Sequence, residues 1–356
     1  MSKVRVARNI YDSQQETMSI DFSPDMQYIA QGCSNGSVYL HSVPTPTINK
    51  ALTSPYSKPV TGISFGPTGS KLVSVQSNGS MCTWNYHGQL IDHQKLNTEL
   101  YTIKYNNQGN QFAVAGRDQI VHIFDDATNK ETQKLQCGHN NRIFGLAYDS
   151  QTSSVLYSGG WDNIVQIWDL RIGQPVQSIH SVQVCGDSID ELDGKLLIGS
   201  WRPNDCLQVY DLRQLKQKLI SIQDLTMESD NEIIVTNNLP FNRQISPAIM
   251  KNDSFIRQDQ VEKSSNSDDS QKQSSNQQQN NPTLIYTCKF NRAQPRLIFG
   301  AGSGGNMMKI FDLDSNSLKG VLKCQSSIYC SALSANGALG AVAGDSFGIN
   351  IFNFDK

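Results

Sequence analysis

Residues 138–171 read GHNNRIFGLAYDSQTSSVLYSGGWDNIVQIWDLR and contain three short runs in which apolar and polar residues alternate. The runs are IFGLAYD, VLYSGG and VQIWDL, and a tight turn at Trp161, Asp162 and Asn163 separates the last two. Alternation with a period of two is typical of a half-buried β-strand. The stretch therefore predicts three strands, the third of which ends at Trp168.

The same pattern recurs along the chain. The slot of Trp168 is filled in turn by His41, Trp84, Phe124, Trp168, Tyr210, Phe311 and Phe352. These positions are separated by 43, 40, 44, 42, 101 and 41 residues, and all but one of the separations match the spacing of about 40–45 residues found in one class of repeat protein. The slot six residues earlier holds the turn-forming residues Asn35, Asn78, Asp118, Asp162, Asn204, Gly305 and Ser346. The period predicts seven copies of one unit.

The fourth copy carries a recognisable signature. Gly138-His139, Ser158-Gly159, Asp162 and Trp168-Asp169 resemble the motif of the WD-repeat family. That resemblance implies an all-β fold, a seven-bladed β-propeller in which an N-terminal strand closes the last blade. The segment from Val4 to Tyr11 is the candidate for this closing strand.

The resemblance also implies a structural tetrad in blade four. In the family such a tetrad links a His, a Ser, an Asp and a Trp by hydrogen bonds, and here it falls on His139, Ser158, Asp162 and Trp168. Pairing of these groups would satisfy polar atoms that the blade buries. Repeat five departs from the motif, since Ser200 is interpreted as its serine but Tyr210 replaces the Trp.

One large gap interrupts the period. The repeat cores are expected at about 17–44, 59–90, 99–130, 138–173, 180–213, 284–313 and 327–354. Residues 226–283 form an insertion between blades five and six, and about 250–282 is rich in Ser, Gln, Asn and Asp, which predicts disorder. The insertion is interpreted either as a tolerated surface loop or as part of a docking face.

Composition and charge predict a soluble protein of the cell interior. Formal charge is −2 and no apolar run approaches the roughly 18 residues of a membrane helix, so neither nucleic-acid binding nor membrane insertion is expected. The eight cysteines form no C-x-x-C pair and are expected to be reduced. We expect a cytoplasmic protein, with cytoskeletal, ciliary or nuclear association left open.

Catalytic motifs fail in context. Residues 300–305 fit G-x-G-x-x-G and residues 344–348 fit G-x-S-x-G around Ser346, but a predicted strand follows each, whereas both motifs require a helix. The six histidines show no metal-ligand spacing. We therefore expect no enzyme activity, no cofactor and no metal, and a hydrolytic propeller is the least favoured alternative.

Two groups of residues are candidates for partner binding. The first consists of aromatic and Arg residues in or beside predicted turns, which are the residue types that dominate interfaces: Trp161, Trp201, Arg202, Arg117 and Arg142. The alternative is that the two indoles fold back onto the loops. The first group predicts a scaffold or adaptor, monomeric itself, inside a multiprotein complex.

The second group is a pair of W-D-x-R-like boxes. Asp169 and Arg171 form one, and Asp211 and Arg213 form a second in which Tyr210 replaces the Trp. The boxes resemble those of propellers that act as substrate receptors of cullin-RING ubiquitin ligases. The alternative is that each Arg pairs with its neighbouring Asp.

Overall fold

The computed structural model describes residues 4–10, 15–45, 48–52, 54–85, 87–202, 204–214, 218–222, 284–303, 305–324, 326–345 and 348–354. The chain divides into a compact unit of Met1–Val235 with Asn281–Lys356 and a unit of Thr236–Asn280, and the second unit lies outside the described residues. The predicted insertion at 226–283 and Ser346 also lie outside them.

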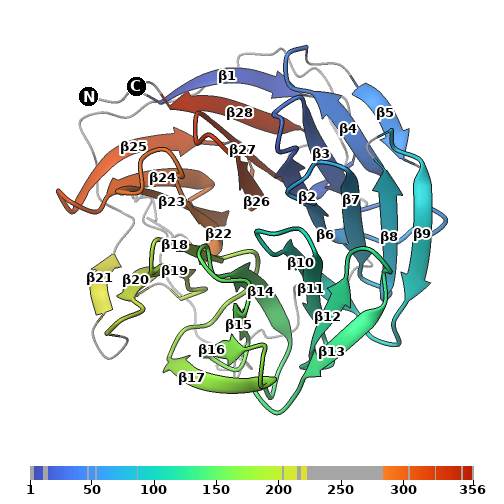
Figure 1. The fold of residues 1–356 in the computed structure, drawn as a ribbon. Coiled ribbons are helices and arrows are strands. Elements are labelled where there is room, and N and C mark those ends of the chain that lie inside the picture. Colours follow the sequence, from blue (N-terminus) through green and yellow to red (C-terminus); the bar gives the residue numbers. More distant parts are fainter. Residues whose placement is uncertain are drawn as a thin grey trace, which may run out of the picture. The chain divides into compact units, whose positions relative to one another are not determined.

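The described part of the first unit is built from strands alone, which form seven antiparallel four-stranded sheets (Figure 1). We number the sheets as blades one to seven in chain order. Blades one to three consist of β2 (Thr17–Phe22), β3 (Tyr28–Cys33), β4 (Val38–Ser42) and β5 (Ile48–Leu52); β6 (Val60–Phe65), β7 (Lys71–Gln76), β8 (Ser80–Asn85) and β9 (Leu90–Lys95); β10 (Leu100–Tyr105), β11 (Gln111–Gly116), β12 (Val121–Asp125) and β13 (Glu131–Leu135). Blades four to six consist of β14 (Ile143–Tyr148), β15 (Val155–Gly160), β16 (Ile164–Asp169) and β17 (Gln174–His180); β18 (Ile189–Leu192), β19 (Lys195–Gly199), β20 (Leu207–Asp211) and β21 (Lys218–Ile222); β22 (Leu284–Phe290), β23 (Leu297–Ser303), β24 (Met307–Asp312) and β25 (Ser317–Lys323).

Blade seven combines the two ends of the chain. Its strands are β26 (Ile328–Leu333), β27 (Leu339–Gly344), β28 (Ile349–Phe354) and, from the N-terminal end, β1 (Val4–Ile10). β1 pairs antiparallel with β28, with Val4 opposite Phe354 and Ile10 opposite Ile349 (Figure 1). The prediction of a seven-bladed propeller closed by an N-terminal strand is confirmed. None of the described segments is a helix that is long and apolar enough to cross a membrane.

The apolar core is divided among the junctions between blades. One buried cluster joins blades three and four, where Ile123 and Leu135 pack with Leu146, Leu156 and Trp168. Comparable clusters join the other neighbouring blades, including blades seven and one, where Ile351 and Ile20 lie in one cluster. A single blade has two apolar faces and cannot bury both alone, so the repeats are stable only when stacked into a closed ring.

Candidate protein-binding site at the channel mouth

The innermost strands share a local irregularity. In the described residues of every blade except blade five, the pairing of the innermost strand with its neighbour slips by one residue near its start. The residues skipped by these β-bulges are Met18, Thr61, Tyr101, Phe144, Tyr286 and Tyr329. A bulge leaves one residue unpaired and re-aims its side chain. The bulges therefore present mostly large side chains at one end of the innermost strands.

The turns between the second and third strands lie at this same end. The backbone N–H of Trp161 donates to the carbonyl of Arg142 at 3.0 Å, just before β14, and the N–H of Arg117 donates to Glu99 at 2.9 Å, just before β10. The N–H of Trp201 donates to Gln183 at 2.7 Å. We call this end of the innermost strands, with its turns, the channel mouth.

Blades three and four place a stacked aromatic group at the channel mouth. The rings of Tyr101 and Phe144 stack with centroids 4.7 Å apart, and Trp161 packs on Phe144 at 5.4 Å. The guanidinium of Arg142 lies 5.8 Å from the centre of the Trp161 ring. Aromatic pairs and cation–π contacts of this kind each add up to about 1 kcal/mol beyond their buried area, so the group is held in place before any partner arrives.

Blades five to seven continue the aromatic arc. Trp201 packs on Tyr286 at 6.4 Å, and Tyr286 meets Tyr329 edge-on at 5.9 Å. Both Trp161 and Trp201 are half-buried against rings of innermost strands, so they fold inward and still present part of their surface. Burial raises the pKa of the Cys185 thiol to about 11, although the Trp161 indole beside it acts in the opposite direction. Cys185 is therefore a neutral thiol and not a nucleophile at neutral pH.

Charges at the channel mouth are unevenly matched. Arg117 pairs with Glu99 at 3.0 Å, and Arg202 donates to the side-chain oxygen of Asn163, also at 3.0 Å. Among the described residues, no carboxylate lies within ion-pair distance of Arg142 or Arg202. The structure thus brings Arg142 and Trp161 into contact. It links Arg117 to the same aromatic group, because Glu99 pairs with Arg117 and accepts from the Tyr101 hydroxyl. Trp201 and Arg202 lie together in the turn of the next blade.

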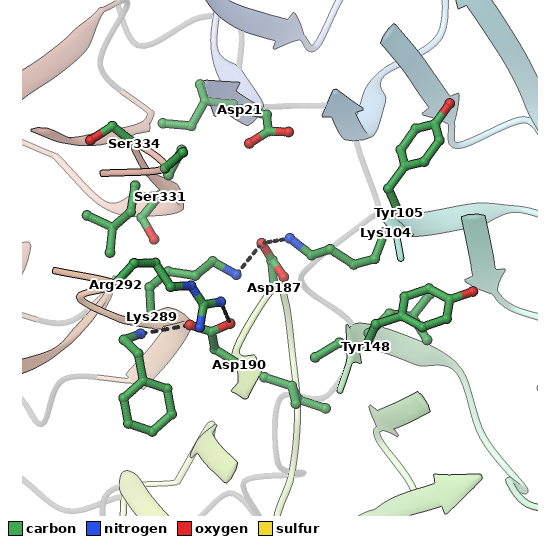
Figure 2. Close-up of a pocket in the computed structure, with 18 of the residues that line it drawn as sticks. Asp21, Lys104, Tyr105, Tyr148, Asp187, Asp190, Lys289, Arg292, Ser331 and Ser334 are labelled. Atoms are coloured by element: carbon green, nitrogen blue, oxygen red, sulfur yellow. Dashed lines mark hydrogen bonds and ion pairs between the residues drawn. The ribbon is translucent and has the colours of Figure 1, made fainter. Parts of the chain in front are cut away.

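The interior of the channel holds charged residues that the sequence did not single out. A cavity of about 230 Å³ is lined by innermost strands of six blades (Figure 2). Lys104 and Lys289 converge on one oxygen of Asp187 at 2.9 and 2.8 Å, and Arg292 pairs with Asp190 at 2.6 Å. These pairs tie together blades three, five and six across the channel.

The pKa values in the cavity follow from burial and from these pairs. Burial opposes the charge of Lys104, but Asp187 and Asp21 outweigh it and raise the pKa of Lys104 to about 12. Burial raises the pKa of Asp21 to about 6, against the effect of Lys104. Asp21 nonetheless accepts the backbone N–H of Phe65 at 2.8 Å, which joins blades one and two. Lys104 therefore stays charged at neutral pH, and the ion pairs of the cavity match its basic side chains with carboxylates.

The four tetrad residues form one chain of hydrogen bonds in blade four. The indole N–H of Trp168 donates to Ser158 at 2.7 Å, Ser158 lies 2.7 Å from Nε2 of His139, and Nδ1 of His139 lies 2.7 Å from Asp162. Because the Asp162 carboxylate can only accept, His139 donates its Nδ1–H to Asp162. In the tautomer with the proton on Nδ1, Nε2 of His139 then accepts from the Ser158 hydroxyl. Burial raises the pKa of Asp162, but His139 together with the backbone N–H groups of Asn140 and Ile164 outweighs burial, and the pKa is lowered. The side chains of His139 and Asp162 are fully buried, so this chain of hydrogen bonds supports the blade and does not contact a partner.

The interpretation of Ser200 as the serine of repeat five is wrong. Ser158 lies opposite Gln166, and in blade five the residue opposite Gln208 is Ile198. The turn between β19 and β20 is longer than its counterpart in blade four, and this length shifts Ser200 out of the strand.

The two W-D-x-R-like boxes lie at the end of their blades opposite the channel mouth. Asp169 ends β16 and pairs with Val155 at the start of β15. Arg171 donates to both oxygens of Asp169 at 2.9 and 2.6 Å and holds its pKa at about 2. The Arg213 side chain is exposed, and its backbone N–H donates to Asp211 at 2.9 Å. The structure therefore separates the boxes from the channel mouth.

The bulge residues and the charged residues of the channel were missed by reasoning from the sequence. A signal existed for the first set, because a large side chain follows the first apolar residue of most innermost strands and breaks the alternation. No comparable signal marks Asp187, because its partners lie 83 and 102 residues away in the chain.

Comparison with known proteins gives a consistent family assignment. The family model "WD domain, G-beta repeat" matches residues 130–169. The chain is 28% identical over 157 residues to the U3 small nucleolar RNA-associated protein 21 homolog of Schizosaccharomyces pombe, which is 43% of this chain and 17% of that protein. It is 28% identical over 184 residues to the THO complex subunit 6 homolog of Danio rerio (46% and 55%), and 28% identical over 146 residues to the anaphase-promoting complex subunit cdh1 of Dictyostelium discoideum (40% and 19%). The chain spans about a fifth to a half of the length of these relatives.

Proposed function

The chain belongs to the WD-repeat β-propeller family, and from that premise we propose that it is a non-catalytic protein-binding platform whose partner docks on the channel mouth. The observation that carries the proposal is the aromatic arc over blades three to seven, in which half-buried rings lie beside Arg142 and Arg202. Pre-positioned aromatic and Arg side chains are the residues that contribute most to protein interfaces. The platform is proposed to be monomeric within its complex and not to bind nucleic acid.

The relatives support a role inside a multiprotein complex. Two of them are named as members of such complexes, the THO complex and the anaphase-promoting complex. A third is named as associated with a small nucleolar RNA, which favours nuclear association over a purely cytoplasmic location for this chain.

Affinity purification of the full chain followed by mass spectrometry tests the site. Wild type is compared with Trp161→Ala/Arg142→Ala at the channel mouth and with Arg171→Ala/Arg213→Ala at the opposite end. We expect the first double variant to lose its main partners, because it removes an anchor and a cation of the same cluster. The second double variant is the matched control. Thermal unfolding of each variant checks that the propeller remains folded.

The second candidate function is ligase recruitment through the W-D-x-R-like boxes. The observation in its favour is the exposure of Arg171, whose side chain is 74% accessible, at an end free of the aromatic arc. In the same purification, loss of a ligase adaptor from the Arg171→Ala/Arg213→Ala variant alone would favour this candidate and refute docking at the channel mouth.

A further inference from the structure

At the channel mouth over blades three to five, two arginines have no carboxylate within ion-pair distance among the described residues. The acids in its turns already have partners: Glu99 pairs with Arg117, Asp118 lies 2.9 Å from Nε2 of His122, and Asp162 is held by His139. Asp205, in the turn of blade five, pairs with Lys218 at 3.2 Å. Arg142 and Arg202 are the cations for which the described residues supply no carboxylate.

Both of these arginines lie against one turn. The turn of blade four runs through Trp161, Asp162 and Asn163, and Asn163 has a left-handed backbone with φ 62°. Arg142 stacks on Trp161 at one side of the turn, and Arg202 reaches from blade five to bind the side chain of Asn163 at the other. The two guanidinium groups therefore flank a single ridge, and a ligand that crosses the ridge meets both.

The surface beside Arg142 is aromatic. Phe144 and Trp161 are half-buried, and they pack on each other, while Phe144 also stacks on Tyr101. Such a surface accepts one apolar or aromatic side chain. The Arg142 guanidinium lies over the Trp161 indole, so the N–H groups at its edge stay available to bind a carboxylate.

We propose that the channel mouth over blades four and five binds an acidic linear peptide, with carboxylates on Arg142 and Arg202 and one aromatic or aliphatic side chain on Phe144 and Trp161. This inference rests on the proposed function and specifies the partner's chemistry. The formal charge of −2 for the chain as a whole argues against a nucleic acid as the occupant, because long-range attraction is absent and the few local cations neutralise few phosphates.

The test uses the full chain and fluorescein-labelled synthetic peptides in fluorescence polarisation. The probe has the sequence GSEDEFEDEGS, and two control peptides replace its acids by Lys or its Phe by Ala. We expect the probe to bind and both controls to bind at least about tenfold more weakly, a difference of about 1.4 kcal/mol. Binding of the probe is expected to weaken as salt rises, because the pairs are partly exposed.

Variants of the protein locate the site. Arg142→Ala and Arg202→Ala should each weaken binding about tenfold, and Arg142→Lys should retain part of it because charge remains while the stacked fork is lost. Arg171→Ala is the matched control and should bind like wild type. Arg142→Glu should prefer the Lys peptide, which keeps the test informative even where an Ala variant is less stable.

Three results would overturn the inference. One is binding of the acidic peptide that is indifferent to Arg142 and Arg202, and another is displacement of the peptide by single-stranded RNA at lower concentration than by unlabelled peptide. The third is that partners are captured through the channel mouth while no acidic peptide binds, in which case the proposed function stands and only the partner chemistry is wrong. If neither partners nor peptide depend on the channel mouth, both proposals fail.

Discussion

Blades four and five have the same strand order and nearly the same register, yet they are stabilised in different ways. Blade four buries Trp168, whose indole begins a chain of hydrogen bonds through Ser158 and His139 to the turn at Asp162. In blade five the positions that correspond to Trp168 and Ser158 hold Tyr210 and Ile198.

In blade five, Tyr210 and Asp205 find partners within the same blade. The Tyr210 hydroxyl donates to the side-chain oxygen of Gln208 at 2.7 Å. Asp205, in the turn between β19 and β20, pairs with Lys218 at 3.2 Å. The fold therefore depends on filled junctions between blades and not on a tetrad in each blade. The difference teaches that a tetrad is one of several ways to satisfy a buried turn.

The largest expected effect is at the aromatic slot itself. Trp168→Phe should lower the free energy of unfolding by about 3 kcal/mol, because it leaves a cavity and removes the donor to Ser158. The matched change in blade five, Tyr210→Phe, removes one hydrogen bond and should cost about 1 kcal/mol. Urea unfolding followed by fluorescence and circular dichroism measures both, and equal losses would contradict the comparison.

A smaller effect is expected from the serine. Ser158→Ala leaves the buried indole of Trp168 and the His139 ring without their shared partner and should cost about 2 kcal/mol in urea unfolding. The control is Ile198→Val at the equivalent position of blade five, which should cost about 1 kcal/mol through lost apolar contact. A Ser158→Ala protein as stable as wild type would show that the tetrad contributes nothing to stability.

Blade three supplies a pH-dependent counterpart to the tetrad. His122 lies between Asp118 at 2.9 Å and Glu131 at 2.5 Å, so both ring nitrogens act as donors and the ring is held as an imidazolium. Burial lowers the pKa of His122, but the two carboxylates outweigh burial and raise it.

A group with a raised pKa in the folded state contributes its full stability below the unfolded value of 6.5, and this contribution disappears as pH rises through the folded value. We expect the free energy of unfolding to be lower at pH 9 than at pH 6, because the neutral ring loses its charge-assisted hydrogen bonds. His122→Gln should abolish this dependence, and melting temperatures at the two pH values check it. An equal fall in wild type and variant would assign the dependence to other groups.

The smallest effect is expected at the end opposite the channel mouth. Arg171 pairs with Asp169 in an exposed setting, with its side chain 74% accessible. Arg171→Ala should leave the midpoint of urea unfolding essentially unchanged, since exposed ion pairs contribute little. A clear drop in the urea midpoint would exceed what an exposed pair contributes and would mean that the pair supports the turn between β16 and β17. Arg171→Ala would then no longer serve as a binding control.

The sequence by itself determined the fold and the residues of the tetrad. The tetrad residues follow from the resemblance of the fourth copy to the WD-repeat motif. The strands of each blade depend on contacts within that blade, and such contacts recur at fixed separations along the chain, so the period of the Trp168 slot reveals the repeated unit. The same logic identified Trp161 and Arg117 as equivalent turn residues, which bond to Arg142 and Glu99 in the same way. The same logic gave a wrong equivalence at Ser200, because the longer turn of blade five changes the number of residues between the serine slot and Tyr210. No local signal in the sequence showed that the strand ends before Ser200.

Only the tertiary structure decided which side chains from different blades meet. No sequence period encodes the contacts between blades. These contacts are Arg202 with Asn163 in the turn of blade four, Trp201 with Tyr286, and Lys104 and Lys289 with Asp187. They arise because closing the ring brings the innermost strands around one channel and aligns their bulges at one end. The physical reason is that packing between repeats, and not pairing within them, sets the distances on which a binding surface depends.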